Sequence, residues 1–148
     1  MGRNRYAGIA DAVQNFFTNT PLNEGKKALV KSMAGDYDKE AASAKLRDGI
    51  ENNAVFMLSF TTCPFCIKAK SVLDNKKATY KVIEVNVAPD GPGIRAEMID
   101  LVGRTSVPAI WINQVFIGGC NDGPLGGIVK LDESGQLDKM LQAAGAVK

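Results

Sequence analysis

The sequence predicts an α/β fold in which a helical N-terminal third precedes a region of alternating strands and helices. An apolar run at residues 54–60 passes directly into a helical pattern at 64–75. Apolar and polar side chains then alternate over residues 79–87, as they do on a half-buried strand. Farther along, two short apolar runs flank Asn113-Gln114, which is typical of a β-hairpin.

Residues 1–52 are predicted to be helical. The apolar side chains of the first predicted helix recur at helical spacing, at Ile9, Val13, Phe16 and Phe17. A second helix is predicted from its cap at Asn23 to Met33, with Gly35 as its stop. A third is capped by Asp36 or Asp38 and closes at Asn52-Asn53. The segment holds no cysteine, glycine-rich loop or cluster of catalytic residue types. We expect helices packed on the domain or a flexible arm, with a short targeting or docking role as the alternative.

Residues 53–148 are predicted to contain elements in the order β-α-β-α-β-β-α. The strands are expected at 55–60, 79–87, 108–112 and 115–117, and the helices at 64–75, at 94–102 after a turn at 91–93, and from the loop 123–127 to about 144. A strand–helix–strand unit implies a right-handed parallel crossover, and the hairpin adds antiparallel strands. We therefore expect a four-stranded mixed sheet with helices on both faces, preceded by the N-terminal helices.

The amino-acid composition argues against several classes of partner, nucleophile and metal site. The 148 residues are 45% apolar and 23% charged, which is ordinary for a globular protein. A net charge of +2 from scattered lysines and arginines predicts no nucleic-acid and no membrane partner. The absence of histidine excludes Cys–His nucleophile pairs and histidine-ligated metals. Three thiols do not complete a tetrahedral zinc site within one chain, so no metal site is predicted.

The cysteine count and the lack of long apolar segments bear on the compartment. Three cysteines, an odd number, argue against a structural disulfide framework and for a reducing compartment. No apolar stretch approaches the roughly 20 residues of a membrane span, and the N-terminus has no apolar core of a secretory signal. We expect a cytoplasmic protein, with an organelle such as the chloroplast or mitochondrion as the alternative.

The segment Cys63-Pro64-Phe65-Cys66 carries the chemistry. It lies where the predicted strand becomes the predicted helix. A helix N-terminus offers unpaired N–H groups and a partial positive charge, and this environment lowers the pKa of a thiol placed there. Two intervening residues allow the second thiol to attack a disulfide formed on the first. The position therefore indicates thiol–disulfide chemistry, with a surface or metal-binding C-x-x-C as the alternative.

Two further motifs follow the cysteines: Thr105-Ser106-Val107-Pro108 and Gly118-Gly119-Cys120-Asn121-Asp122. With Cys63-Pro64-Phe65-Cys66, and in this order and spacing, they make residues 50–148 resemble a dithiol glutaredoxin of the thioredoxin-like fold. The resemblance implies that Cys63 is the exposed nucleophile and Cys66 the more buried resolving thiol. It also implies a glutathione groove lined by Phe65, Arg95, Val107, Pro108, Gly119, Cys120, Asn121 and Asp122.

The resemblance implies a role for each part of that groove. Pro108 is expected to be cis, leaving the Val107 backbone free to pair with an extended ligand. The N–H groups around Cys120 and Asn121, with the Asp122 carboxylate, are expected to hold the γ-glutamyl end of glutathione. Arg95 is expected to pair with the glycine carboxylate. The Cys120 thiol is expected to be packed or occasionally oxidised and not catalytic.

The sequence departs from the family's pattern in three places. Phe60 stands where a Lys or Arg often precedes the nucleophile by three residues. Residues 123–127 look like an insertion at the rim of the groove, and the N-terminal extension has no counterpart that suggests a function.

The expected function is reduction of protein–glutathione mixed disulfides and other disulfides, with glutathione as co-substrate. The expected partners are glutathione and glutathionylated or disulfide-bonded proteins, and we expect a monomer. Two alternatives are a dimer that binds a glutathione-ligated [2Fe–2S] cluster and a thioredoxin-type dithiol reductase. Pro64 argues against the first, because family members that hold clusters usually have a small residue there. The missing Trp-Cys-Gly-Pro-Cys motif argues against the second.

Overall fold

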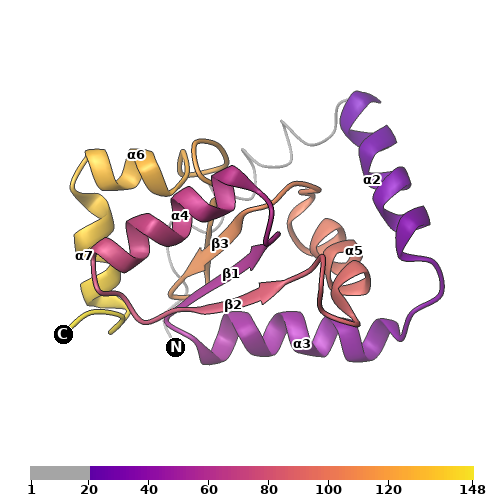
Figure 1. The fold of residues 1–148 in the computed structure, drawn as a ribbon, viewed down its shortest axis with the longest axis horizontal. Coiled ribbons are helices and arrows are strands. Elements are labelled where there is room, and N and C mark those ends of the chain that lie inside the picture. The colour runs from indigo at the N-terminus through magenta and orange to yellow at the C-terminus, as the bar shows by residue number, and fades with distance from the viewer. Residues whose placement is uncertain (1–20) are drawn as a thin grey trace.

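The computed structural model describes residues 21–148, which form one sheet with helices on both faces (Figure 1). The elements are α2 (Pro21–Ala34), α3 (Lys39–Asn52), β1 (Val55–Ser59), α4 (Pro64–Asn75), β2 (Lys81–Glu84), α5 (Gly91–Val102), β3 (Ala109–Ile112), β4 (Val115–Gly118), α6 (Ile128–Glu133) and α7 (Gln136–Ala143). The helix predicted around Ile9 and Phe16 lies outside the described residues.

The sheet has the predicted four strands, in the order β2-β1-β3-β4. β1 pairs with β2 in parallel, with Met57 opposite Val82, and with β3 in an antiparallel register, with Met57 opposite Ile110. β3 and β4 form the predicted hairpin. Its turn residues Asn113 and Gln114 have left-handed φ angles of 51° and 67°, which suit the twist of a two-residue hairpin loop.

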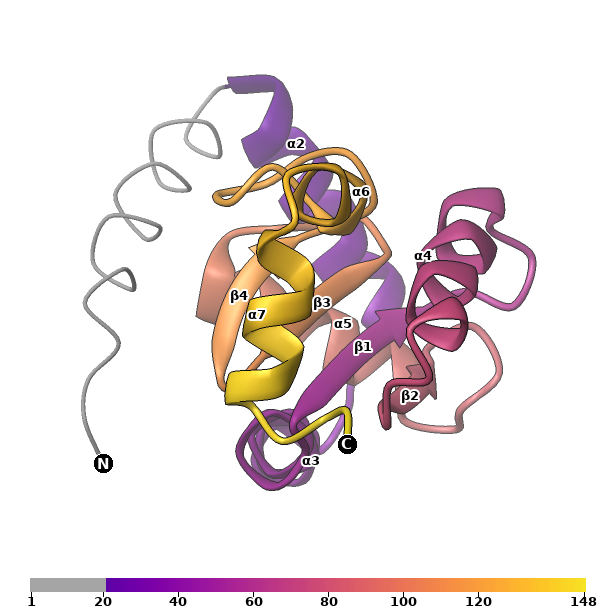
Figure 2. The same ribbon diagram turned by 90° about the vertical axis from the view of Figure 1, so that its left-hand side faces the viewer.

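Two apolar cores lie on the two faces of the sheet. Alternate residues of β1 divide between them, so that Val55 and Met57 face one core and Phe56 and Leu58 face the other. The first core is completed by α4, α6 and α7, and the second by α3 and α5. Figure 2 shows α7 in front of the sheet and α5 behind it. The predicted three-layer arrangement is therefore confirmed.

The N-terminal helices pack on the second face and on α5. Ala42, Leu46 and Ile50 of α3 are buried in the second core. The Tyr37 hydroxyl donates to Glu97 of α5 at 2.7 Å, and Lys31 of α2 pairs with Asp100 of α5 at 2.8 Å.

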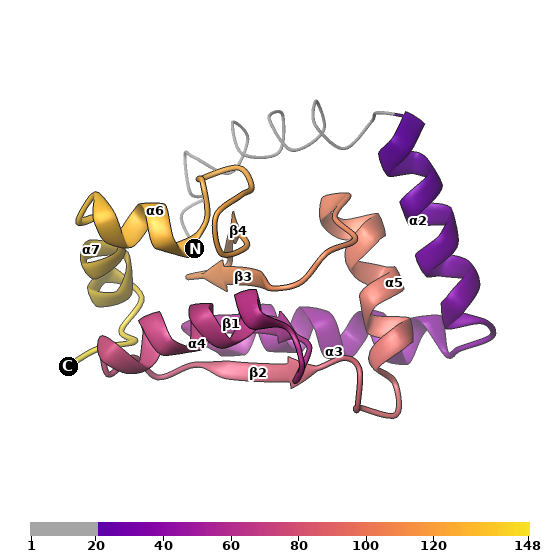
Figure 3. The ribbon, with the colours of Figure 1, turned by 45° about the horizontal axis from the view of Figure 1, so that its top comes forward.

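Figure 3 shows α2 beside α5, at the end of the molecule away from α6 and α7. The second core thus includes residues from both sides of the predicted boundary between 1–52 and 53–148.

The structure corrects several predicted element ends. α2 begins at Pro21, so Asn23 lies inside the helix, whereas the Asp38 cap of α3 is confirmed by its bond to the Ala41 N–H at 3.0 Å. The predicted turn at 91–93 is the first turn of α5, which Pro92 favours. The strand predicted over 79–87 is limited to β2, because the Glu84 carbonyl accepts the Val87 and Ala88 N–H groups in a turn.

The helical region predicted after the loop 123–127 is two helices, α6 and α7. Ser134 and Gly135 separate them, and Gly135 has a left-handed φ of 79° that ends the first helix and redirects the chain.

We predict that Gly49→Ala destabilises the protein while Gly25→Ala does not. A Cβ at Gly49 would lie 2.3 Å from the buried Phe56 ring, whereas a Cβ at Gly25 would meet no atom within 4 Å. Overpacking should lower the free energy of unfolding by about 1–3 kcal/mol, and alanine at the open helix site should leave it equal or raise it by up to about 1 kcal/mol. Urea unfolding measures both, and equal midpoints for the two variants would contradict the packing of α3.

Candidate functional site

The two cysteines of the C-x-x-C motif lie where β1 leads into α4. Cys63 directly precedes the helix with extended backbone angles (φ −84°, ψ 120°), and Pro64 occupies the first turn. A proline fits there because its missing N–H would have no partner inside the helix. The Cys63 carbonyl accepts the Ile67 N–H at 3.1 Å, which begins the helical hydrogen bonding. The predicted placement of Cys63 at a helix N-terminus is thus confirmed.

The loop before Cys63 is fixed to the turn that follows β2. The Thr61 N–H donates to Asn86 Oδ1 at 3.1 Å, and Asn86 Nδ2 donates to Thr61 Oγ1 at 2.8 Å. This reciprocal pair holds the loop at both its backbone and its side chain.

The three thiols are unpaired and differ in exposure. Cys63 is half-buried, whereas Cys66 and Cys120 are buried. The Cys63 thiol lies 4.0 Å from the Val107 carbonyl oxygen, across from the loop before β3. Burial raises the pKa of Cys66 and likewise that of Cys120. Cys63 is therefore the thiol of the three that a solute reaches.

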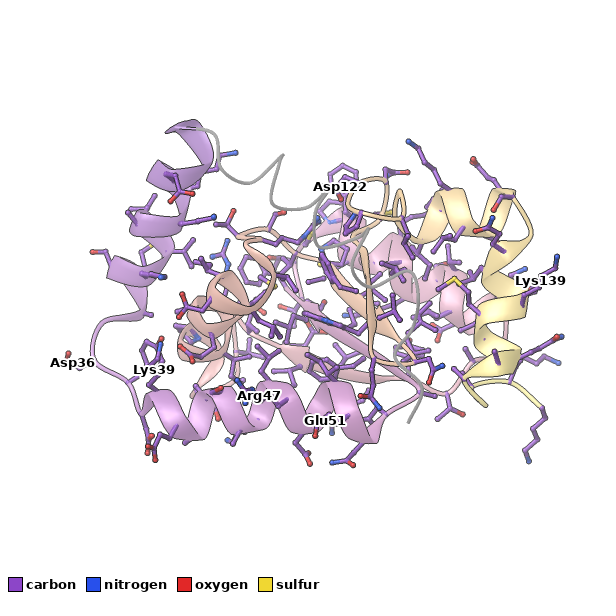
Figure 4. The ribbon with its side chains drawn as sticks, turned by 180° about the vertical axis from the view of Figure 1, so that it is seen from behind. Asp36, Lys39, Arg47, Glu51, Asp122 and Lys139 are labelled. Atoms are coloured by element: carbon purple, nitrogen blue, oxygen red, sulfur yellow. The ribbon has the colours of Figure 1, made fainter. Side chains whose placement is uncertain are left out.

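A pocket of about 250 Å³ is bordered by Phe65 and by Val107, whose carbonyl oxygen lies 4.0 Å from the Cys63 thiol. It is lined by Phe65, Arg104, Ser106, Val107, Pro108, Cys120, Asn121 and Asp122. The three motifs, far apart in sequence, thus meet at one place. The peptide bond between Val107 and Pro108 is cis, as predicted. Figure 4 places Asp122 at the edge of the molecule opposite Arg47 and Glu51 of α3.

The double glycine at the end of β4 is required by close packing within the protein. Gly118 has a left-handed φ of 106°, and a Cβ there would lie 2.1 Å from the Asp122 carbonyl oxygen. A Cβ at Gly119 would lie 2.3 Å from Arg104 Nη2. Gly119, which the resemblance places in the glutathione groove, is not among the residues that line the pocket, and the protein's own atoms occupy the space beside both glycines.

Arg104 and Ser106 line the pocket but were not among the predicted groove residues, and Arg104 is the one that carries a charge. It is 7% exposed, and its guanidinium donates to the carbonyl oxygens of Ser106 (3.0 Å) and Pro108 (3.1 Å). The same Nη2 donates to Asp122 Oδ1 at 2.9 Å. Arg104 therefore ties the cis-proline loop to the loop that carries Asp122. A buried arginine needs several acceptors, and because one of those of Arg104 lies 18 residues away at Asp122, no local pattern in the sequence identified its role.

Arg95 lies outside this pocket lining. Its Nε donates to the Thr105 carbonyl oxygen at 2.9 Å, and its guanidinium carbon lies 5.0 Å from the centre of the Phe60 ring. Burial lowers the pKa of Arg95. Phe60 occupies the position where the family often has a Lys or Arg. Its ring nevertheless has a cation beside it, because the Arg95 guanidinium makes a cation–π contact with the ring. The contact of Arg95 with a glycine carboxylate stays a prediction.

The start of α6, directly after the segment 123–127, is held against the Gly119–Cys120 backbone. The Ile128 N–H donates to the Gly119 carbonyl at 2.9 Å, and the Val129 N–H donates to the Cys120 carbonyl at 3.0 Å. No side chain caps α6, so the Asp122 carboxylate is directed to Arg104 and not to this helix.

Within the described range 21–148, no group of three or more Cys, Asp or Glu residues is placed to hold a metal ion. Across the same range, every helix is too short or too polar to cross a membrane.

Comparison with known proteins agrees with this geometry. The glutaredoxin family model matches residues 54–117. A glutaredoxin from Ricinus communis is 35% identical over 106 residues, which are 72% of this chain and 99% of the relative. Glutaredoxin-C6 from Oryza sativa subsp. japonica is 32% identical, over 72% of this chain and 90% of the relative.

Solved structures of similar proteins share the fold. A crystal structure of a buckwheat glutaredoxin–glutathione complex is similar with a TM-score of 0.69 and 28% identity, over 74% of this chain and 96% of that one. Oxidised glutaredoxin 2 from Chlamydomonas reinhardtii is similar with a TM-score of 0.66 and 33% identity, over 75% of this chain and all (100%) of that one. The fold is therefore thioredoxin-like, as predicted, and the chain belongs to the glutaredoxin family of thiol–disulfide oxidoreductases.

Proposed function

We propose that this protein is a glutathione-dependent oxidoreductase that reduces protein–glutathione mixed disulfides and other disulfides through Cys63. One observation carries the proposal. The accessible thiol at the N-terminus of α4 faces Val107, which lines a pocket together with the Arg104–Asp122 ion pair. The similar buckwheat protein was solved in complex with glutathione, which supports the same ligand here.

The chemistry of glutathione suits the groups around the pocket. Its γ-glutamyl end carries an ammonium and a carboxylate, and its centre is an extended peptide. Asp122 is 64% exposed, so its carboxylate is open to an ammonium while it also pairs with Arg104. Backbone N–H groups around Cys120 and Asn121 suit the γ-glutamyl carboxylate, and the Val107 backbone suits the extended centre.

In the proposed reaction, the Cys63 thiolate attacks the glutathione sulfur of a mixed disulfide. A bond forms between Cys63 Sγ and the glutathione sulfur, and the substrate leaves as a thiolate that takes a proton from water. A second glutathione thiolate then attacks the same glutathione sulfur, so that glutathione disulfide leaves and the Cys63 thiolate is restored. In the dithiol route, Cys66 instead attacks Cys63 Sγ and releases glutathione, and two glutathiones later reduce the Cys63–Cys66 disulfide.

We assign the redox chemistry to residues 53–148 and a supporting role to the extension 1–52. The supporting role is suggested by α3, because its Leu46 is 2% exposed and packs in the second core against the sheet. We further propose that the protein acts as a monomer in a reducing compartment.

The Cys→Ser variants test the roles of the two thiols. Cys63→Ser should abolish reduction of a glutathione mixed disulfide in a glutathione-coupled assay, because no accessible nucleophile is left among the described thiols. Cys66→Ser should retain it, because a second glutathione resolves the intermediate. Turnover of Cys63→Ser close to that of wild type would refute the proposal.

Replacing Arg104 tests the pocket. In Arg104→Ala we expect the apparent KM for glutathione to rise by about tenfold, because the loops that carry Pro108 and Asp122 lose the charged hydrogen bonds that hold them. Such a bond contributes about 1.5–3 kcal/mol, and about 1.4 kcal/mol corresponds to a factor of ten. Arg104→Lys should lie between this variant and wild type, since it keeps the charge and loses the two-pronged geometry. Arg47→Ala, on the opposite side of the molecule, is the control. An unchanged KM in a folded Arg104→Ala protein would show that the pocket does not bind glutathione.

Alkylation at different pH values tests the thiol environments. Burial raises the pKa of Cys66 and of Cys120, so at neutral pH each holds less thiolate than an ordinary cysteine and gains it only as the pH rises above the usual range. Brief iodoacetamide treatment at pH 7 should modify Cys63, with Cys66 and Cys120 reacting only at alkaline pH. Peptide mass spectrometry reads the three sites, and the chain unfolded in urea should lose the selectivity. Modification of Cys66 as fast as Cys63 at pH 7 would contradict the described burial.

A further inference from the structure

A cluster of polar side chains joins the chain between α2 and α3 to α5. The Tyr37 hydroxyl donates to Glu97 Oε2 at 2.7 Å, and Lys39 Nζ lies 3.2 Å from the same oxygen. Lys39 and Lys31 also pair with the two carboxylate oxygens of Asp100, at 3.0 and 2.8 Å. Glu97 is 6% exposed, and a carboxylate that is so enclosed is stable only when it has partners. The N-terminal segment and α5 are therefore held together at defined atoms.

Tyr37 contacts α5 at two places. A Cβ at Gly93 would lie 2.7 Å from the Tyr37 ring, so the ring packs directly on the helix backbone there. The hydroxyl of the same side chain bonds to Glu97, about one turn farther along the helix. Burial, together with the bond to Glu97, raises the pKa of Tyr37 to about 12, so the hydroxyl keeps its proton at neutral pH and remains a donor. One side chain thus fixes a full turn of α5.

Arg95 lies between these two contacts in the sequence and on the other side of the helix. Residue 95 is about half a turn from both residue 93 and residue 97, which share one side of α5. The Arg95 guanidinium carbon lies 5.0 Å from the centre of the Phe60 ring, and its Nε donates to the Thr105 carbonyl oxygen at 2.9 Å. The helix is therefore held between Tyr37 on one side and the contacts of Arg95 on the other.

The position of Arg95 suits the far end of a bound glutathione. In the proposed complex the γ-glutamyl end lies at Asp122 and the extended centre lies along Val107, so the glycine carboxylate is at the opposite end of the peptide. Arg95 borders the loop before α4 through Phe60 and the loop before β3 through Thr105. A guanidinium binds a carboxylate through two parallel hydrogen bonds only when its plane is correctly placed, so a small displacement of α5 weakens this contact.

We propose that Tyr37 is a positioning residue for glutathione binding, whose contacts with Gly93 and Glu97 set α5 so that Arg95 reaches the glycine carboxylate. The inference rests on the proposed function. The glutaredoxin family model matches residues 54–117, and Tyr37 precedes that range. The N-terminal segment then acts on the affinity for glutathione through α5, and the chemistry at Cys63, which lies on a different element, proceeds as before.

The test is a double-mutant cycle between Tyr37→Phe and Arg95→Ala in the glutathione-coupled assay. Tyr37→Phe should raise the apparent KM for glutathione by about threefold and leave kcat within about twofold of wild type. Arg95→Ala should raise the apparent KM by about tenfold, as for loss of a hydrogen bond to a charged group. The double variant should match Arg95→Ala, because without the guanidinium the position of α5 no longer affects the carboxylate.

Tyr80→Phe is the matched control. The Tyr80 hydroxyl also donates to a carboxylate, that of Asp74, at 2.7 Å, but its ring packs against the first core, on the face of the sheet away from α5. This variant loses the same kind of bond as Tyr37→Phe and should keep the wild-type KM.

Three results would overturn the inference and leave the proposed function standing. The first is a KM of Tyr37→Phe equal to that of Tyr80→Phe, and the second is an unchanged KM in Arg95→Ala. The third is an equal rise in KM when Tyr37→Phe is added to Arg95→Ala, because Tyr37 would then act by another route. A wild-type protein that shows no turnover with glutathione would overturn the proposed function and the inference together.

Discussion

Burial of β1 on both faces is the constraint on which the rest of the molecule depends. Its side chains supply both cores, and its two edges pair with β2 and β3, so the strand has one register and one direction. A strand held in this way ends at a defined point, and the chain that leaves it begins α4 with Cys63. Directly after the strand, the Phe60 N–H donates to Cys66 Sγ at 3.4 Å. The redox pair is thus placed by the centre of the sheet.

The side of the pocket formed by Pro108 and Asp122 depends on the buried guanidinium of Arg104. Arg104 holds the carbonyl oxygens of Ser106 and Pro108 and the carboxylate of Asp122, so two loops that follow different elements keep one relative position. The nearly buried guanidinium has acceptors on both loops, which is the condition for a charge to be stable there. The pocket is therefore formed before any ligand arrives.

Much of this could be predicted from the sequence because the signals were local. The apolar alternation of the strands, the Asn113-Gln114 turn and the three motifs each fix their own element. The missed features depend on contacts between elements. No local pattern in the sequence predicts that Arg104 hydrogen-bonds Asp122, or that Leu46 of α3 packs against the sheet. The sequence predicted one helical region in place of α6 and α7, because the helical pattern continues on both sides of Gly135.

We propose that Cys63 carries glutathione in the pocket between Val107 and the Arg104–Asp122 pair. A crystal structure of the Cys66→Ser variant after reaction with glutathione disulfide tests this directly. We expect a disulfide between Cys63 and glutathione, with the peptide beside Val107 and its ammonium at Asp122. Glutathione bonded to Cys120, or bonded to Cys63 with its chain directed away from Asp122, would contradict it.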